Sequence, residues 1–180
     1  MKIKSIGYGS FTKAYTSDSH EGVILVSWDK VREIQALGFF PESPLFPIVQ
    51  WAGDELNTHM LNRTRNTRPC ETYLMPYYGK VTAPKKQLNN QAYQIYKVLR
   101  RIASTNNCHG YNKLFKLFDN APLPIDVKNA LLDALNGLSD YGADICFEIS
   151  PRNISISDSG GLVLRDCFFF KHQLAETIKI

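Results

Sequence analysis

The sequence predicts an α+β fold in two parts, with a strand-rich first half and a helical second half. Short β-branched and alternating apolar runs fill residues 1–75, whereas apolar residues recur at helical spacing from about residue 84. The intervening Pro76-Tyr77-Tyr78-Gly79 has the composition of a hinge. We therefore expect a strand-rich lobe at 1–75, a hinge at 76–79 and a helical lobe at 80–180.

The bulk composition is that of a soluble globular chain, with 44% hydrophobic and 21% charged residues. No run approaches the ~18 apolar residues of a membrane span, and residues 1–5 lack the apolar core of a signal peptide. The four cysteines are scattered, which favours reduced thiols over a zinc site or a disulfide framework. We expect a cytoplasmic protein without a membrane partner. The net charge of +4 is too small to indicate nucleic-acid binding.

The first predicted element is a strand, glycine turn and strand over residues 3–15. Gly7 and Gly9 allow backbone N–H groups to approach an anion closely, and Phe11 could cover it. A plain hairpin turn is the alternative. Further strands are predicted at 22–27, 48–51 and 71–75, and a short helix at 31–37. Residues 56–61 are expected to continue the sheet or form a turn.

The second half is predicted to be helical. Apolar residues follow helical spacing over 87–104 and 124–141, and Gly142 ends the second of these helices, whereas residues 111–118 are expected to form a short helix or turn. Residues 174–180 form a short terminal segment.

A β-hairpin is predicted between these helices and the terminal segment. The apolar alternations at 154–156 and 162–164 flank a turn of Ser, Asp and Gly. Asn153 precedes the first strand and Asp166 follows the second, so the fold of a hairpin brings them close together. An amide oxygen and a carboxylate facing one volume suit Mg²⁺. An ordinary surface hairpin with polar ends is the alternative.

Four segments together resemble motifs of the protein-kinase-like fold. The run from Gly7 to Tyr15 resembles the glycine-rich loop, and Met75-Pro76-Tyr77 falls where the family has its hinge. Residues 147–153 resemble the catalytic loop, and Asp166-Cys167-Phe168 matches the metal-binding aspartate motif. Little chain follows Asp166, and in this feature the sequence is most similar to the small Ser/Thr kinase domain of T7-type phages, in degenerate form.

The resemblance implies a small antiparallel N-lobe, a truncated helical C-lobe and a site for ATP with Mg²⁺. It implies that Gly7, Gly9, Ser10, Phe11 and Met75 contact the nucleotide. The metal would be held by Asn153 and Asp166. Glu148 stands at the position of the catalytic aspartate, one methylene longer, and could accept or orient a hydroxyl proton.

One departure from the family concerns the phosphate-clamping lysine, because Leu25 stands at its position. Lys13 and Lys30 are the candidate replacements. Lys13 lies one residue beyond the position used by the with-no-lysine kinases, which on a strand means the opposite face. Lys30 requires a shifted register. Glu33 could act as the helix glutamate that pairs with the lysine, or it could face solvent.

Three functions remain open from the sequence. The first is an atypical Ser/Thr kinase that uses ATP and Mg²⁺ to modify protein substrates. The second is a pseudokinase that binds a partner without phosphotransfer, and the third is an interaction protein with a kinase-like scaffold. The resemblance to phage kinases implies a host protein as substrate or inhibited partner, and the host cytoplasm as the compartment.

Overall fold

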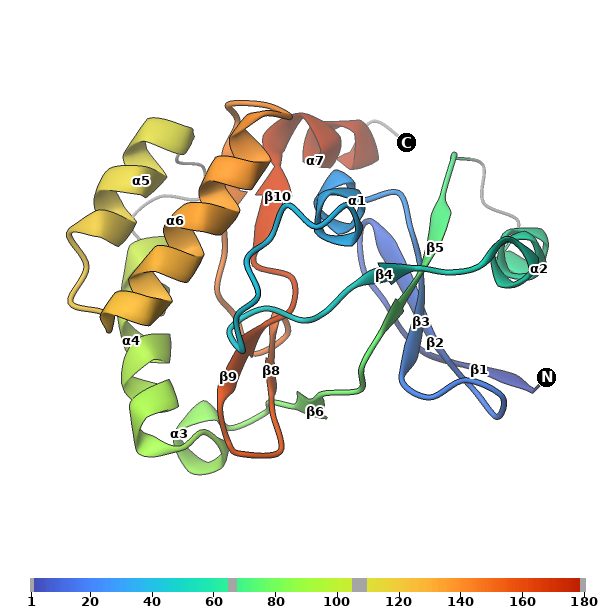
Figure 1. The fold of residues 1–180 in the computed structure, drawn as a ribbon, viewed down its shortest axis with the longest axis horizontal. Coiled ribbons are helices and arrows are strands. Elements are labelled where there is room, and N and C mark those ends of the chain that lie inside the picture. Colours follow the sequence, from blue (N-terminus) through green and yellow to red (C-terminus); the bar gives the residue numbers. More distant parts are fainter. Residues whose placement is uncertain (1, 65–67, 105–109, 179–180) are drawn as a thin grey trace. The chain divides into compact units, whose positions relative to one another are not determined.

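The computed structural model describes residues 2–64, 68–104 and 110–178 (Figure 1). The chain divides into two compact units. The first consists of Met1–Gly38 with Ile48–Tyr77, and the second of Phe39–Pro47 with Tyr78–Ile180. Strands and helices both contribute, and a small antiparallel sheet is present, so the predicted α+β class is confirmed.

The first unit contains an antiparallel sheet of five strands. They are β1 (Ile3–Tyr8), β2 (Thr12–Ser17), β3 (Val23–Ser27), β4 (Gln50–Trp51) and β5 (Glu71–Met75), in the order β1-β2-β3-β5-β4. The strands predicted in this half are confirmed. Every residue of β3 is buried, which accounts for its run of β-branched and aliphatic side chains.

Two helices accompany this sheet, α1 (Lys30–Ala36) and α2 (Asp54–Thr64). Helix α1 was predicted, and it begins at Asp29, whose carboxylate accepts the N–H of Val31. The prediction of a strand or turn at 56–61 is wrong. Residues Leu56 and Met60 lie four apart and pack together against β3, so burial of this narrow apolar stripe fixes a helix.

The second unit is built mainly of helices, and the three predicted helical regions are confirmed. The elements are α3 (Pro84–Gln87), α4 (Asn90–Ser104), α5 (Tyr111–Asp119), α6 (Ile125–Ser139) and α7 (Lys171–Ile178). Strands β6 (Gly79–Lys80), β8 (Ile154–Ile156) and β9 (Leu162–Leu164) form one sheet, in the order β6-β8-β9. Strands β7 (Ile145–Phe147) and β10 (Phe168–Phe170) form another.

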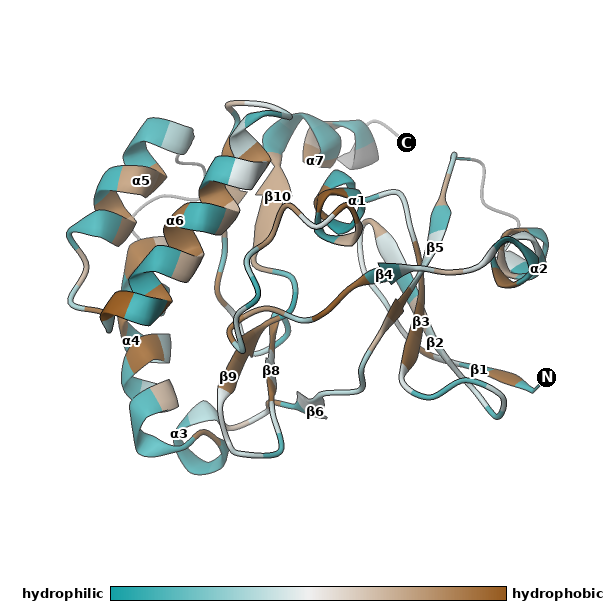
Figure 2. Cartoon of the chain, in the orientation of Figure 1, coloured by the Kyte–Doolittle hydropathy of each residue, from teal (hydrophilic) through white to brown (hydrophobic). Residues whose placement is uncertain are grey.

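An aromatic cluster lies in the core of the second unit. Phe118 and Phe147 have ring centroids 5.1 Å apart, and Phe147 and Phe168 have centroids 5.0 Å apart. The helices contribute aliphatic side chains at helical spacing, visible as alternating bands along α4 and α6 (Figure 2). Because Phe147 and Phe168 are paired across β7 and β10, this cluster fixes the chain on both sides of the β8–β9 hairpin.

Two further observations concern the cysteines and the length of the helices. Cys146 is disulfide-bonded, so the expectation of reduced thiols is wrong for this residue. In the described part of the chain, every helix is too short or too polar to cross a lipid bilayer.

Candidate functional site

The glycine turn of the first unit has an open backbone. The Gly9 N–H donates to the carbonyl of Thr12 at 2.8 Å, which closes the turn between β1 and β2. A Cβ built on Gly7 meets no described atom within 4 Å, and one on Gly9 meets only the Thr12 oxygen at 3.9 Å. Neither glycine has the left-handed φ that excludes other residues. Internal packing therefore does not require glycine here, and an outside group has room to approach the backbone.

Phe11, at the end of this turn, packs onto Trp28. Their ring centroids are 5.0 Å apart in an edge-to-face arrangement, and the Trp28 N–H donates to the Phe11 carbonyl at 3.1 Å. Trp28 also packs against the apolar cluster formed with α2. The contact therefore turns Phe11 toward the α2 side of the sheet. To cover an anion bound on the Leu25 side of the sheet, the Phe11 ring would have to leave this position.

The strand register places Leu25 and Lys13 on opposite faces of the sheet. Leu25 lies opposite Ala14 on β2 and opposite Tyr73 on β5, whereas Lys13 lies opposite Val26. Directly opposed residues in antiparallel strands share a face, and Val26 belongs to the cluster beneath α2. Lys13 thus extends from the α2 face, as the one-residue offset predicts, and cannot reach the position of Leu25 without a change of register.

The face that carries Leu25 is buried and lies in an acidic environment. Leu25 is only 4% exposed, and its neighbour Tyr73 is only 2% exposed. Burial raises the pKa of Tyr73 well above its ordinary value, and the negative charges of Glu33, Glu71 and Asp29 raise it further. Because Asp29 and Glu33 belong to α1 and its N-cap, their effect indicates that this part of α1 lies near Tyr73.

Lys30 and Glu33 pair with each other on α1. The Lys30 Nζ lies 2.7 Å from Glu33 Oε1, and each side chain is about one-third exposed, at 35%. The helix glutamate therefore has a lysine partner, but from its own helix and not from a strand. Met75, expected at the nucleotide, is buried at the end of β5, where its carbonyl faces Gly22.

The β8–β9 hairpin of the second unit forms in the predicted register, with Ile154 opposite Leu164 and Ile156 opposite Leu162. Its two ends meet through the backbone. The carbonyl of Asn153 accepts the N–H groups of Arg165 at 3.0 Å and Asp166 at 2.9 Å. The prediction that the hairpin brings Asn153 and Asp166 close together is confirmed for their backbone atoms.

Three residues with oxygen-bearing side chains, Glu148, Asn153 and Asp166, have their backbones at or beside this junction. Glu148 lies next to it, because its N–H donates to the carbonyl of Cys167 at 2.8 Å. Both Glu148 and Asp166 are exposed. The Asn153 Oδ1 accepts a hydrogen bond from Ser150 Oγ at 3.0 Å, which orients the amide. The donors are an amide oxygen and carboxylates, the set that Mg²⁺ prefers, so the residues fit this ion.

Two hydrogen bonds at the site were not expected from the sequence. Ser150 orients Asn153, although only its short spacing in the loop could have suggested this. Arg165 donates from Nη2 to the carbonyl of Arg152 at 2.6 Å, which holds a positive charge at the same junction. Both interactions stiffen the segment that carries Asn153.

The comparisons with known proteins give no support from relatives. No family model, no curated protein and no solved structure matches the chain. Support for a functional site therefore comes from the geometry within each unit. The glycine turn and Leu25 belong to the first unit, and the hairpin junction belongs to the second.

Proposed function

We propose that this chain is a protein-kinase-like protein that binds ATP together with Mg²⁺. The observation that carries the proposal is the junction at which the Asn153 carbonyl accepts the N–H groups of Arg165 and Asp166. It brings the backbones of Asn153 and Asp166 together at the base of the hairpin, which supports a site where an amide oxygen and a carboxylate bind one metal ion.

The chain's own residues have separate roles in this proposal. Asn153 and Asp166 hold Mg²⁺, which when bound neutralises phosphate charge. The backbone at Gly7 and Gly9 and the hydroxyl of Ser10 contact the phosphates, since a Cβ on Gly7 would meet no described atom within 4 Å and one on Gly9 only the Thr12 oxygen. Met75 borders the base. Glu148, exposed beside the junction, orients the proton of an attacking hydroxyl.

Whether phosphate is transferred depends on a cation that replaces the missing strand lysine. Phosphoryl transfer relies on positioning and on charge stabilisation, so a lost cation reduces the rate directly. An atypical Ser/Thr kinase would use Lys30, paired with Glu33, on protein substrates. The position of Lys13, on the face of the sheet that Leu25 does not share, favours the second candidate, a pseudokinase that binds and inhibits a partner, such as a host protein.

The decisive experiment measures the melting temperature with and without ATP and Mg²⁺. At a ligand concentration about 100 times Kd, binding adds about 2.7 kcal/mol, which raises the melting temperature by roughly 5–11 °C for a chain of this size. Asp166→Ala abolishes the increase. Asp158→Ala, which removes an exposed carboxylate from the hairpin turn, keeps it.

A parallel assay follows labelled γ-phosphate onto added protein. Thermal stabilisation with transfer that Asp166→Ala abolishes identifies the kinase, and stabilisation without transfer identifies the pseudokinase. No stabilisation by ATP at saturating Mg²⁺ would refute the proposed function.

A further inference from the structure

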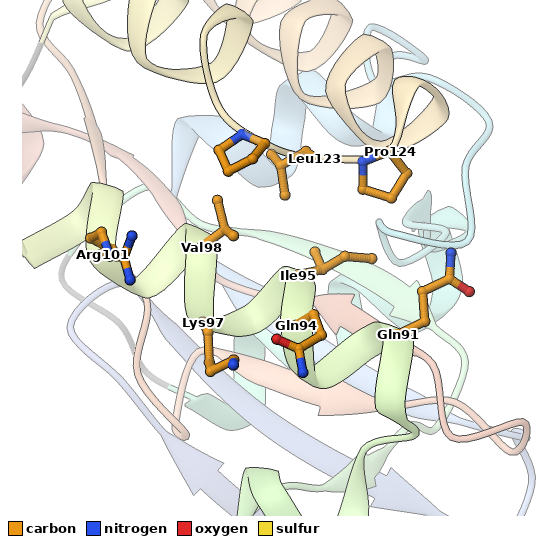
Figure 3. Close-up of a pocket in the computed structure, with 9 residues that line it drawn as sticks. Gln91, Gln94, Ile95, Lys97, Val98, Arg101, Leu123 and Pro124 are labelled. Carbon is orange, nitrogen blue, oxygen red and sulfur yellow. The ribbon is translucent and has the colours of Figure 1, made fainter.

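The second unit contains a pocket of about 370 Å³ between α4 and the connection from α5 to α6. Its floor is apolar, with Ile95 and Val98 from α4 and Leu123 from the connection. Figure 3 shows Ile95 and Val98 pointing from α4 toward Leu123 and Pro124. A cavity of about 150 Å³ holds a benzene ring, so this pocket has room for about two large side chains.

The wall opposite α4 is fixed by hydrogen bonds before any ligand arrives. Lys128 Nζ donates to the carbonyl of Asp119 at 2.5 Å, and Asn120 Nδ2 donates to the carbonyl of Lys116 at 2.8 Å. The Leu123 N–H donates to the carbonyl of Ala121 at 2.8 Å. A preformed wall lowers the ordering cost of binding, which favours a real binding site over a transient gap.

The rim of the pocket is basic. Lys97 and Arg101 are exposed and line it, and Gln91 and Gln94 add amide groups along the same helix. No carboxylate contributes to the described lining. Asp119 and Asp126 lie near the connection in the sequence without lining the pocket.

The surrounding chain extends this charge. Residues 72–118 contain eight of the 21 Lys and Arg residues and none of the 17 Asp and Glu residues. This stretch therefore carries +8 and the rest of the chain −4, an asymmetry that the net charge of +4 conceals. The helix that supplies Lys97 and Arg101 to the pocket belongs to this basic stretch of the chain, which favours an acidic ligand.

We propose that this pocket docks an acidic segment of a protein partner, with large apolar side chains in the cavity and carboxylates on Lys97 and Arg101. The aliphatic floor favours a peptide over nucleic acid, since no aromatic ring in the described lining offers a surface for base stacking. Ile125, next to Pro124, is 70% exposed and extends the apolar surface. The docking site is separate from the residues proposed for ATP and does not depend on them.

The test is a selection of peptides from a random displayed library on the full chain, followed by affinity measurements on the enriched peptides. We expect enriched sequences with large apolar residues flanked by Asp or Glu. The double charge reversal Lys97→Glu with Arg101→Glu weakens their binding about tenfold or more. Lys85→Glu with Lys86→Glu changes the charge equally on α3, outside the pocket, and changes affinity less than about threefold.

Three results would overturn the docking proposal. One is a selection that yields no acidic, apolar peptide. Another is equal loss of affinity in both double variants, which indicates attraction by overall charge alone. The third is an oligothymidylate probe that binds as tightly as the selected peptides and competes with them. Leu123→Ser provides an independent check, since it weakens peptide binding without changing any charge.

Discussion

Glycines of the first unit allow a structural role to be separated from a ligand-binding role. Gly22 precedes β3 with φ of +88°, and a Cβ there would lie 2.4 Å from the carbonyl oxygen of Met75. In Gly22→Ala the left-handed φ alone costs about 1–2 kcal/mol. The strand backbone at Met75 must also move, so we expect a total loss of about 3 kcal/mol. For a chain of this size the melting temperature falls by roughly 6–12 °C.

Gly9→Ala has the opposite pattern of effects. Its Cβ meets only the Thr12 oxygen, at 3.9 Å, so stability changes by less than about 1 kcal/mol in either direction. If the turn holds phosphate, the new methyl group blocks close approach, and the stabilisation by ATP with Mg²⁺ is lost. Gly53→Ala is the matched control, because a Cβ there meets no described atom within 4 Å and φ is not left-handed. It keeps both the stability and the response to ATP.

The assay is thermal unfolding of the four proteins, wild type included, with and without ATP and Mg²⁺. A Gly22→Ala variant as stable as wild type contradicts the tight approach of residue 22 to the end of β5. A Gly9→Ala variant with the full response to ATP contradicts phosphate binding at the turn, even if Asp166→Ala abolishes binding.

Two further predictions concern charged groups. If Lys30 is the relocated cation, Lys30→Met lowers the thermal stabilisation by ATP or the rate of phosphate transfer. Lys13→Met changes neither, because Lys13 lies on the other face of the sheet. The reverse result in binding and transfer assays would refute the assignment of faces. The second prediction concerns Asp144, which accepts hydrogen bonds from His172 at the start of α7. Burial alone would raise the pKa of Asp144. The hydrogen bonds from the backbone and ring of His172, together with the charge of His172, outweigh burial and lower this pKa. A lowered carboxyl pKa stabilises the fold at neutral pH, and this contribution disappears as the carboxylate is protonated below about pH 4. Asp144→Asn therefore lowers the free energy of unfolding by about 0.3–1 kcal/mol at pH 7 and by little at pH 3, as measured by urea unfolding. A loss of stability that is the same at both pH values would contradict this role.

The fold was predictable wherever the local sequence is consistent with the packed structure. The β3 strand is a continuous β-branched run because both of its faces are buried, and the β8–β9 hairpin follows from its turn residues. Helix α2 was missed because most of its residues are polar and few apolar residues mark its period. Its formation depends on contact with β3, some thirty residues earlier in the chain, which no local pattern contains.

The site was predictable to a similar depth. The two-residue period of a strand placed Lys13 and Leu25 on different faces of the sheet, and the hairpin placed Asn153 near Asp166. The packing of Phe11 onto Trp28 was not predictable, since the residues are distant in sequence and the ring could have turned either way. The run of residues 72–118 without Asp or Glu was visible in the sequence, but the total charge concealed it.

The charges around Tyr73 show what a leucine at residue 25, in place of a lysine, means for the proposed nucleotide site. Glu33, Glu71 and Asp29 raise the pKa of this buried tyrosine beyond the effect of burial, whereas Arg32 lowers it, so these three carboxylates contribute a negative potential at Tyr73 beside Leu25. A lysine at residue 25 would oppose that potential and attract phosphate, whereas a leucine leaves it in place. Binding of a nucleotide near this face then depends more heavily on a metal ion to offset repulsion between the phosphates and the carboxylates.

The positive charge that remains near this face comes from α1. Arg32 lowers the pKa of Tyr73 and is buried, and Lys30 is paired with Glu33 on the same helix. A cation on a helix follows the helix when it shifts, whereas a strand lysine is fixed by the ladder of the sheet. If ATP draws Lys30 away from Glu33, the ion pair is lost as phosphate contact is gained, and exposed pairs of this kind contribute only about 0–1 kcal/mol. If the chain transfers phosphate with Lys30 as the cation, the position of α1 limits the rate more than the strength of that pair does, which is why binding and transfer must be measured separately.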